Sequence, residues 1–313
     1  MFAARAADVT RSRALLHVAF GAQAVIVQRI MAAELPSQIG LVGAGLIGGS
    51  IGQRLARMLP GVPLRVHDMS PGNAAFVAER HPRGSVAVEM TGLAGCDVVF
   101  VATPVSTIAG HVAALLTLEG APVVIDTGSA KTAILDVLSA NGVDMARFVP
   151  GHPLAGGISA GPGESRAQIL ASRPFVLAPH DTVEADALDA ARTLLDHLGV
   201  EVVEMSPSAH DAMLATGSHL PHLIAFALAA MADPADRALI PNSFRGVAGF
   251  AEADAQMWAD IFHANAGELR KSAEIFTKRL DLLLAMADET APGALLETLE
   301  EARANFDALE NDA

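Results

Sequence analysis

Residues 39–50 read IGLVGAGLIGGS, and this stretch decides the fold that the sequence predicts. The apolar run Ile39–Val42 indicates a buried strand. Gly43, Gly45 and Gly48 follow with the spacing G-x-G-x-x-G, and the segment after them favours a helix. A strand, these glycines and a helix in this order are typical of a loop that binds the pyrophosphate of a dinucleotide.

The glycines of this loop each have a separate steric role. The first allows a tight turn, the second lets the backbone approach a pyrophosphate, and the third lets the helix pack close to the strand. The N-terminus of the helix adds unpaired N–H groups and a partial positive charge. We therefore predict cofactor-binding residues at Gly43, Gly45, Leu46, Ile47 and Gly48. A glycine-rich turn without a ligand is the alternative interpretation.

An acid stands at the end of the next predicted strand. Residues 63–67 form that strand, and Asp68 follows about 20 residues after Gly48, the spacing at which such folds bind the adenosine ribose. A carboxylate there accepts hydrogen bonds from the ribose hydroxyls. Residues 69–71 contain no Arg or Lys that could neutralise a 2′-phosphate, so the sequence predicts NAD rather than NADP.

Short apolar strands and helices continue to alternate up to about residue 205. We predict strands at 97–102, 122–126, 174–178 and 200–204, and helices at 73–80, 105–116, 129–140 and 183–197. Such alternation indicates a parallel sheet with helices on both faces. We expect the strands at 174–178 and 200–204 to extend this same sheet. The predicted fold class is thus α/β, with a doubly wound, mostly parallel Rossmann-type sheet.

The pattern changes after this point, where only long helical stretches follow, at residues 209–231, 254–286 and 293–309. We predict an NAD-binding domain over residues 38–205 and an all-helical substrate and dimerisation domain over residues 206–313. A substrate cleft between such domains is typical of dehydrogenases. Helices this apolar often also bury a dimer face, so we expect a homodimer.

Composition excludes several classes of partner. The net charge of −14 argues against nucleic acid and anionic membranes, which would repel the protein. The hydrophobic content is 51% and the mean hydropathy +0.38, and from the sequence we expect no uncharged apolar run long enough to span a bilayer. A single cysteine, Cys96, rules out an internal disulfide framework and fits a reducing compartment, so we expect a cytoplasmic protein.

The first 37 residues differ from the remainder of the chain. Residues 1–30 contain four arginines and one acid in an otherwise acidic protein. An organelle-targeting segment is one interpretation, because such segments are rich in arginine and poor in acids. The interpretation that we favour is an upstream start codon, with Met31 as the true first residue. In both cases we expect residues 1–37 to lie outside the fold, as a disordered or mis-started extension.

Polar side chains gather where the predicted strands end, the edge at which such sheets bind ligands. Thr103 and Pro104 follow one strand, Ser129 follows the next, and His152 lies in a later turn between glycines. Histidine is the natural general base near neutral pH.

The helical part adds His219 and His222. Metal binding is the competing interpretation for this pair. Pro221 lies between them and no acid motif accompanies them, so we predict no metal.

Six motifs, taken together and in this order, resemble the prephenate/arogenate dehydrogenase family of tyrosine biosynthesis. They are residues 43–50 (GAGLIGGS), 102–105 (ATPV), 126–131 (DTGSAK), 151–156 (GHPLAG), 210–211 (HD) and 218–222 (SHLPH). The resemblance covers residues 38–280. It implies oxidative decarboxylation of a cyclohexadienyl substrate, with hydride transfer to NAD+, loss of the ring carboxylate as CO2 and aromatisation of the ring.

The resemblance also implies roles for individual residues. His152 resembles the general base that takes the proton of the ring hydroxyl, and Ser129 the side chain that orients this hydroxyl. Thr103 and Pro104 resemble the wall beside the nicotinamide and its ribose. His219 and His222 resemble histidines that line the substrate cleft. Trp258 resembles a tryptophan that dimers of the family offer to the neighbouring subunit's site.

One position departs from the family pattern. Where the family has an arginine that binds the ring carboxylate of the substrate, this chain has Gly249, while the preceding basic position is kept as Arg245. We expect Arg245 to have taken over the carboxylate. Two alternatives remain open: a related two-domain dehydrogenase that acts on another small acid, and an NAD-binding protein without catalytic activity.

Overall fold

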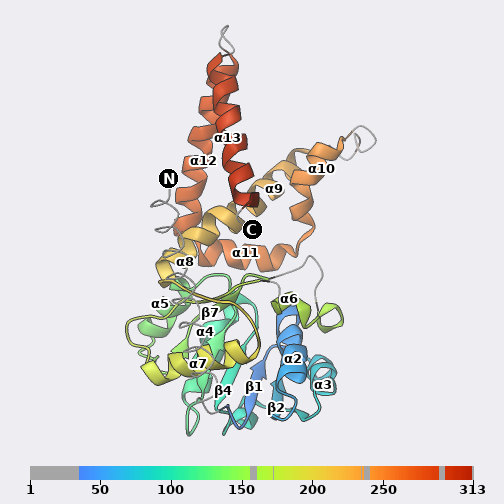
Figure 1. The fold of residues 1–313 in the computed structure, drawn as a ribbon, viewed down its shortest axis with the longest axis vertical. Helices are drawn as coiled ribbons and strands as arrows, with labels where there is room; N and C mark the ends of the chain where they lie inside the picture. Colours follow the sequence, from blue (N-terminus) through green and yellow to red (C-terminus); the bar gives the residue numbers. More distant parts are fainter. Residues whose placement is uncertain are drawn as a thin grey trace, which may run out of the picture. The chain divides into compact units, whose positions relative to one another are not determined.

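The computed structural model describes residues 35–155, 161–171, 173–233, 235, 240–288 and 293–311 (Figure 1). The predictions for the N-terminal extension therefore fall outside the described residues, except for residues 35–37. The chain divides into two compact units. Unit 1 runs to Asp211 and also contains Glu252–Ala264, and unit 2 comprises Ala212–Ala251 and the chain from Asn265 onward. The domain boundary near residue 205 stays a prediction.

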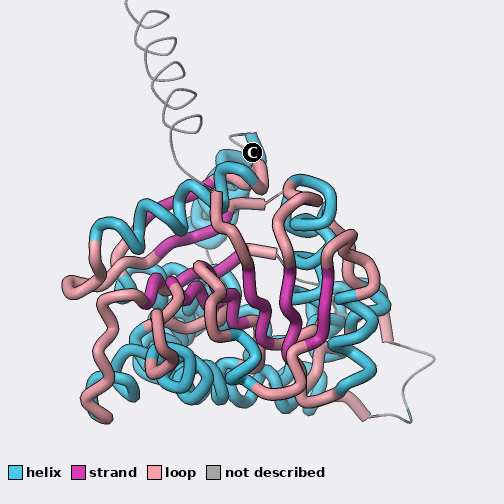
Figure 2. Tube along the Cα trace, turned by 90° about the horizontal axis from the view of Figure 1, so that it is seen from below, coloured by secondary structure: helices cyan, strands magenta, loops and turns pink. Residues whose placement is uncertain are grey.

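Unit 1 contains a six-stranded parallel sheet with the order β3-β2-β1-β4-β5-β6. Its strands are β1 (Ile39–Val42), β2 (Leu64–His67), β3 (Gly84–Val86), β4 (Val98–Val101), β5 (Val123–Asp126) and β6 (Phe148–Val149). Figure 2 shows the strands of the protein in magenta, several of them side by side. The strand order reverses between β1 and β4, which is where doubly wound sheets bind their ligands. The predicted α/β fold class is confirmed; β3 and β6 were not predicted as strands.

Helices cover both faces of this sheet, and each face has its own hydrophobic core. Successive residues of β4 point alternately into one core and the other. Val98 and Phe100 pack in the core shared with α2 (Leu46–Met58), α3 (Pro71–Ala78) and α7 (Ala185–His197). Val99 and Val101 pack in the core shared with α4 (Val105–Leu116) and α5 (Thr132–Ala140). Because neighbouring strand residues point to opposite faces, a strand buried on both faces is apolar throughout.

The strands predicted at 174–178 and 200–204 exist, but the expectation that they extend the first sheet is wrong. They are β8 (Phe175–Leu177) and β9 (Val202–Glu204), and they form a second sheet with β7 (Gly151–Pro153) in the order β7-β8-β9. The chain leaves the first sheet at Pro150, which has no N–H to continue the ladder. The carbonyl of Pro150 instead accepts a hydrogen bond from Ala178 N (2.8 Å) in the second sheet.

The C-terminal part of the chain is helical, as predicted. Its helices are α8 (Pro207–Leu214), a π-helical turn (Ala215–His219), α9 (Leu220–Met231), α10 (Asn242–Ala248), α11 (Ala255–Ala264), α12 (Ala266–Ala287) and α13 (Gly293–Asn311). The single helix predicted over 254–286 is two helices that meet at Asn265, and α11 belongs to unit 1. Helix α10 was not predicted.

The continuous helical stretch Pro207–Met231 is long and apolar enough to cross a membrane by length and composition. The expectation that no run meets this criterion is therefore wrong, because the residues after Asp211 carry no Asp, Glu, Lys or Arg up to Met231. Length and composition do not by themselves make a span, since core helices pass the same test. His219 in this stretch is fully buried and contacts Asn265.

We expect alanine at Gly48 to destabilise unit 1 far more than alanine at Gly45. A Cβ at Gly48 would lie 1.9 Å from the carbonyl oxygen of Gly43, whereas a Cβ at Gly45 meets nothing within 4 Å. Overpacking of this kind costs about 1–3 kcal/mol or more, and loss of glycine at the start of α2 costs under about 1 kcal/mol. Thermal denaturation of Gly48→Ala and Gly45→Ala without added ligand measures the difference. Equal melting temperatures would contradict it.

Candidate active site

The glycine loop between β1 and α2 has the shape that a dinucleotide requires. Gly43 adopts φ +90°, and a Cβ there would lie 2.5 Å from the carbonyl oxygen of Ala102. Gly48 allows α2 to pack against Gly43, and Gly45 faces open space that a side chain would fill. Leu46 and Ile47 open α2, where N–H groups have no carbonyl partner in the preceding turn. An anionic pyrophosphate fits this helix start.

Asp68 is fixed in place by the backbone around it. Its Oδ2 accepts a hydrogen bond from Ala44 N in the glycine loop (2.7 Å), and its Oδ1 accepts one from Ser70 N (2.7 Å). Each carboxylate oxygen has a further lone pair, so the same group can accept ribose hydroxyls while it holds the loop. The adjacent Met69 side chain is 98% exposed and brings no positive charge to this place.

Thr103 and Pro104 lie beside the loop, at the end of β4. A Cβ placed on Gly43 would lie 2.9 Å from the Thr103 methyl group, so the two residues are immediate neighbours. Thr103 Oγ1 accepts a hydrogen bond from Thr107 Oγ1 (3.0 Å), and Pro104 precedes the first residue of α4. The predicted nicotinamide wall therefore stands at the same edge of the sheet as the pyrophosphate loop.

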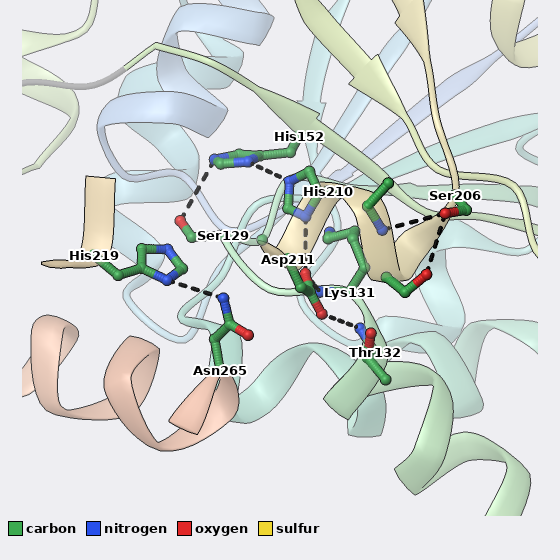
Figure 3. A network of polar contacts seen from close by, with 12 residues as sticks. Ser129, Lys131, Thr132, His152, Ser206, His210, Asp211, His219 and Asn265 are labelled. Atoms are coloured by element: carbon green, nitrogen blue, oxygen red, sulfur yellow. Dashed lines mark hydrogen bonds and ion pairs between the residues drawn. The ribbon is translucent and has the colours of Figure 1, made fainter. Parts of the chain in front are cut away.

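Ser129 and His152 are brought together from two different sheets. Ser129 follows β5 in the first sheet, and His152 is the central residue of β7 in the second. The Ser129 Oγ lies 3.5 Å from His152 Nε2, and His152 is 8% exposed (Figure 3). A hydroxyl and an imidazole nitrogen thus face one another at the carboxyl edge of the first sheet.

A chain of buried groups continues behind His152. His152 Nδ1 lies 2.9 Å from His210 Nε2, and His210 Nδ1 lies 2.8 Å from Asp211 Oδ1 (Figure 3). Asp211 also accepts hydrogen bonds from the backbone N–H groups of Lys131 and Thr132, each at 2.8 Å. Sequence reasoning noted the His-Asp pair at 210–211 as a motif but gave it no role. Its signal was an acid directly after a histidine at the start of a helix.

A buried ion pair fixes the segment that carries His152. Lys131 Nζ contacts Asp126 Oδ2 and donates to the carbonyl of Gly151 (2.7 Å), while Asp126 Oδ1 accepts from Gly151 N (3.0 Å). Asp126 Oδ2 also accepts from Gly128 N (2.8 Å). Burial lowers the pKa of Lys131, and the charge of Asp126 opposes this shift. The pair therefore holds both polar groups of the residue that precedes His152.

The other predicted substrate residues lie in unit 2 and are described within it. His219 ends the π-helical turn, and its Nδ1 lies 3.1 Å from Asn265 Nδ2. His222 Nδ1 lies 2.9 Å from the Ser218 carbonyl, and burial lowers its pKa. Arg245 is an exposed residue of α10, and Gly249 directly follows that helix, with nothing within 4 Å of a Cβ placed there.

Two further side chains complete the comparison with the predictions. Trp258 in α11 is buried and packs against Phe262, with ring centroids 5.4 Å apart. Cys96 is buried, and burial raises the pKa of its thiol to about 11, which does not suit a nucleophile. Among the described residues, no group of three or more His, Cys, Asp or Glu side chains could hold a metal ion.

Family models and curated proteins similar to this chain all point to the same family, and together the matches extend over most of its length. Family models described as "Prephenate dehydrogenase, nucleotide-binding domain" and "Prephenate dehydrogenase, dimerization domain" match residues 52–204 and 206–301. A cyclohexadienyl dehydrogenase of Zymomonas mobilis is 28% identical over 88% of this chain and 96% of its own length. A probable prephenate dehydrogenase of Streptomyces niveus is 30% identical over 82% of this chain and 71% of its own length.

A solved structure gives the same comparison in three dimensions. The prephenate dehydrogenase of A. aeolicus, in complex with hydroxyphenyl propionate and NAD+, superposes with a TM-score of 0.80 at 26% identity. The match covers 89% of this chain and 99% of that one. A match of this extent includes residues of both units of this chain.

We expect Lys131→Met to destabilise the protein by about 3–5 kcal/mol, because it leaves the Asp126 carboxylate buried without its counter-ion. The double variant Asp126→Asn, Lys131→Met should be more stable than this single variant, since it buries no unpaired charge. Lys271→Met is the matched control, since Lys271 is exposed beside Glu268 and its loss should cost under about 1 kcal/mol. Urea unfolding of the four proteins measures these differences. A single variant no less stable than the Lys271 control would contradict the argument.

Proposed function

The chain belongs to the prephenate dehydrogenase family, and from this premise we propose that it catalyses the NAD-dependent oxidative decarboxylation of prephenate, arogenate or both. The products are 4-hydroxyphenylpyruvate and tyrosine, respectively. The observation that carries the proposal is the pairing of Ser129 with His152, 3.5 Å apart at the sheet edge that also holds the glycine loop. A base and a hydroxyl at this place suit the oxidation of a secondary alcohol beside a nicotinamide.

The cofactor site is proposed from the residues that fit it. Gly43, Gly45, Leu46, Ile47 and Gly48 would hold the pyrophosphate of NAD at the start of α2. Asp68 would hold the adenosine ribose, and Thr103, Pro104 and Ser129 would flank the nicotinamide ribose and ring. NAD+, when bound, accepts a hydride from the carbon that carries the ring hydroxyl.

His152 is the proposed general base of the reaction. Its Nε2 takes the proton of the ring hydroxyl, and Ser129 orients this hydroxyl by a hydrogen bond. As the hydroxyl carbon becomes a carbonyl, the bond to the ring carboxylate breaks and CO2 leaves. The electrons of that bond complete an aromatic ring, and the carbonyl oxygen ends as a phenol after protonation. Aromatisation makes this step effectively irreversible.

Recognition of the ring carboxylate falls to unit 2 in this proposal. Arg245 supplies a guanidinium from α10. Gly249, four residues later and directly after this helix, has no side chain and leaves free space next to it. His219 and His222 are proposed to line the substrate site. The departure at Gly249 favours a second candidate, a dehydrogenase of the same architecture that acts on another small acid.

We propose that the protein is a homodimer. The dimerization-domain match, residues 206–301, includes most of unit 2. Helices α12 and α13 expose a set of large apolar side chains that a partner would cover: Ile275, Leu280, Leu284, Leu296, Leu299, Phe306 and Leu309. The placement of Trp258 near the partner's site rests on the family resemblance alone. A cytoplasmic location is likewise proposed, from the single cysteine of the chain.

The function is tested by absorbance at 340 nm with NAD+ and either prephenate or arogenate. We expect NADH formation with at least one substrate, and a higher kcat/KM with NAD+ than with NADP+, because Asp68 would repel a 2′-phosphate. Equal or better kcat/KM with NADP+ would contradict the role of Asp68. Retained NAD+ binding without turnover of either substrate would favour the inactive NAD-binding protein, and turnover of another hydroxy acid would favour the second candidate.

We expect Arg245→Ala to lower kcat/KM at least tenfold and to leave NAD+ affinity unchanged. Removing a contact to a desolvated carboxylate typically costs about 2–5 kcal/mol. Gly249→Arg should strengthen substrate binding, since a Cβ at this position meets open space. Arg303→Ala on α13 is the exposed-arginine control and should leave both parameters unchanged. If Arg245→Ala and Gly249→Arg are both silent, another group binds the carboxylate or the substrate has none at that place.

A further inference from the structure

His152 is the outermost group of a line that runs from Ser129 through two imidazoles to the carboxylate of Asp211 (Figure 3). His210 and Asp211 are 0% and 1% exposed. They lie too far inside to meet a substrate, and the reaction as set out above gives them no step. Any part that they play in the reaction acts through His152.

Asp211 decides which group donates each hydrogen bond in this line, because its carboxylate accepts hydrogen bonds and does not donate them. Burial by itself raises the pKa of Asp211, but hydrogen bonds from His210, Thr132 and Lys131 outweigh burial and lower it below its ordinary value. Two of these donors are the backbone N–H groups of Lys131 and Thr132 at the start of α5, where the helix dipole also favours a negative charge. The carboxylate is therefore ionised and can only accept.

The tautomers of both histidines follow from this carboxylate. His210 must carry its proton on Nδ1 to donate to Asp211, which leaves Nε2 of a neutral His210 as an acceptor. His152 must then carry its proton on Nδ1 to donate to His210 Nε2. Neutral His152 is left with an acceptor at Nε2, the atom that faces Ser129. Asp211, which lies two hydrogen bonds from His152, thus determines that Nε2 is the nitrogen of His152 that can take the hydroxyl proton.

The same line stabilises the charge that catalysis creates. When Nε2 of His152 takes a proton, the imidazolium can pass its Nδ1 proton to His210 Nε2 over 2.9 Å, and the charge moves next to Asp211. Near His152 in unit 1, Asp126 and Lys131 form a buried ion pair that contacts the preceding Gly151. Asp211, reached through His210, adds a negative charge that favours a proton on this pair of histidines.

We propose that His210 and Asp211 are positioning residues that hold His152 in its Nδ1–H tautomer and share the proton it gains from the substrate. The tautomer is a property of the protein alone. The shared proton rests on the proposed function, since the substrate hydroxyl supplies it. The bond that forms is N–H at His152 Nε2, and the bond that breaks is O–H of that hydroxyl.

The first test replaces the acceptor by a donor. In Asp211→Asn, an amide nitrogen in the place of Oδ1 donates to His210 Nδ1 and gives up the contact with Lys131 N. In this orientation both tautomers reverse, and a proton lies on His152 Nε2. We expect kcat to fall by about 10²–10⁴, toward the value of His152→Asn, because a base in the wrong tautomer cannot accept. The acidic limb of the kcat profile should also move to lower pH, since a carboxylate that favours imidazolium is gone. A merely structural role would lower stability without moving this limb.

The second test separates tautomer from proton sharing. In His210→Gln the amide oxygen can still accept from His152 Nδ1, but the amide takes up no proton. We expect a smaller loss of kcat than in Asp211→Asn. The acidic limb should again move to lower pH, but by less, because the proton of His152 can no longer pass to His210 while the charge of Asp211 remains. His197→Gln, a change at the end of α7, is the control and should alter neither parameter.

The deciding measurement is ¹⁵N NMR of histidine-labelled protein without substrate, assigned with His152→Asn and His210→Gln. We expect Nδ1–H tautomers for both histidines in the natural protein, and Nε2–H tautomers in Asp211→Asn. An Nε2–H tautomer of His152 in the natural protein overturns the inference, and so does an unchanged acidic limb in both variants. Correct tautomers without NADH formation from prephenate or arogenate would instead contradict the proposed function. If Asp211→Asn does not fold, the His152 tautomer in the natural protein and the acidic limb of His210→Gln still test the inference.

Discussion

The buried ion pair of Asp126 and Lys131 is the constraint on which the candidate active site depends. Asp126 is the last residue of β5, and its carboxylate accepts hydrogen bonds from the N–H groups of Gly128 and Gly151. Lys131 donates a hydrogen bond to the carbonyl of Gly151. A buried pair of this kind adds little net stability, because desolvation cancels much of the attraction. Its effect is geometric: it fixes the point at which the chain passes from the first sheet to the second. His152 is the next residue, so its orientation follows from this point.

The same pair explains why so much of unit 1 is linked through a few atoms. Lys131 pairs with Asp126 through its side chain, while its backbone N–H binds Asp211. The loop from Asp126 to Lys131 therefore contacts β7 on one side and Asp211 in α8 on the other. Ser129 lies within this loop and is carried to His152 by the same contacts. A change in the pair would thus displace hydroxyl, base and carboxylate together.

The sequence predicted what depends on local chemistry and missed what depends on distant partners. The glycine loop was predicted residue by residue, because its requirements are local: Gly48 meets Gly43 a few positions away, and Gly43 meets Ala102 at the end of the adjoining strand. The strands at 175–177 and 202–204 were also predicted, but not their sheet, because strand pairing depends on where Pro150 interrupts the first ladder. The role proposed for Asp211 depends on two backbone N–H groups at the start of α5, about 80 residues away in the chain, which a periodic pattern in the sequence does not reveal.

Chemistry and substrate recognition are distributed unequally between the units. The glycine loop, Asp68, Ser129, His152 and the groups behind it all belong to unit 1, so the contacts described among them involve no residue of unit 2. The one departure from the family pattern, Gly249, falls in unit 2, at the end of a short helix where a side chain has free space. Because the base is held by buried contacts within unit 1, residues that bind the acid group of the substrate can change without altering its tautomer. The glycine at position 249 is therefore compatible with the base proposed in unit 1, and in the proposed function its effect is on which anion is bound.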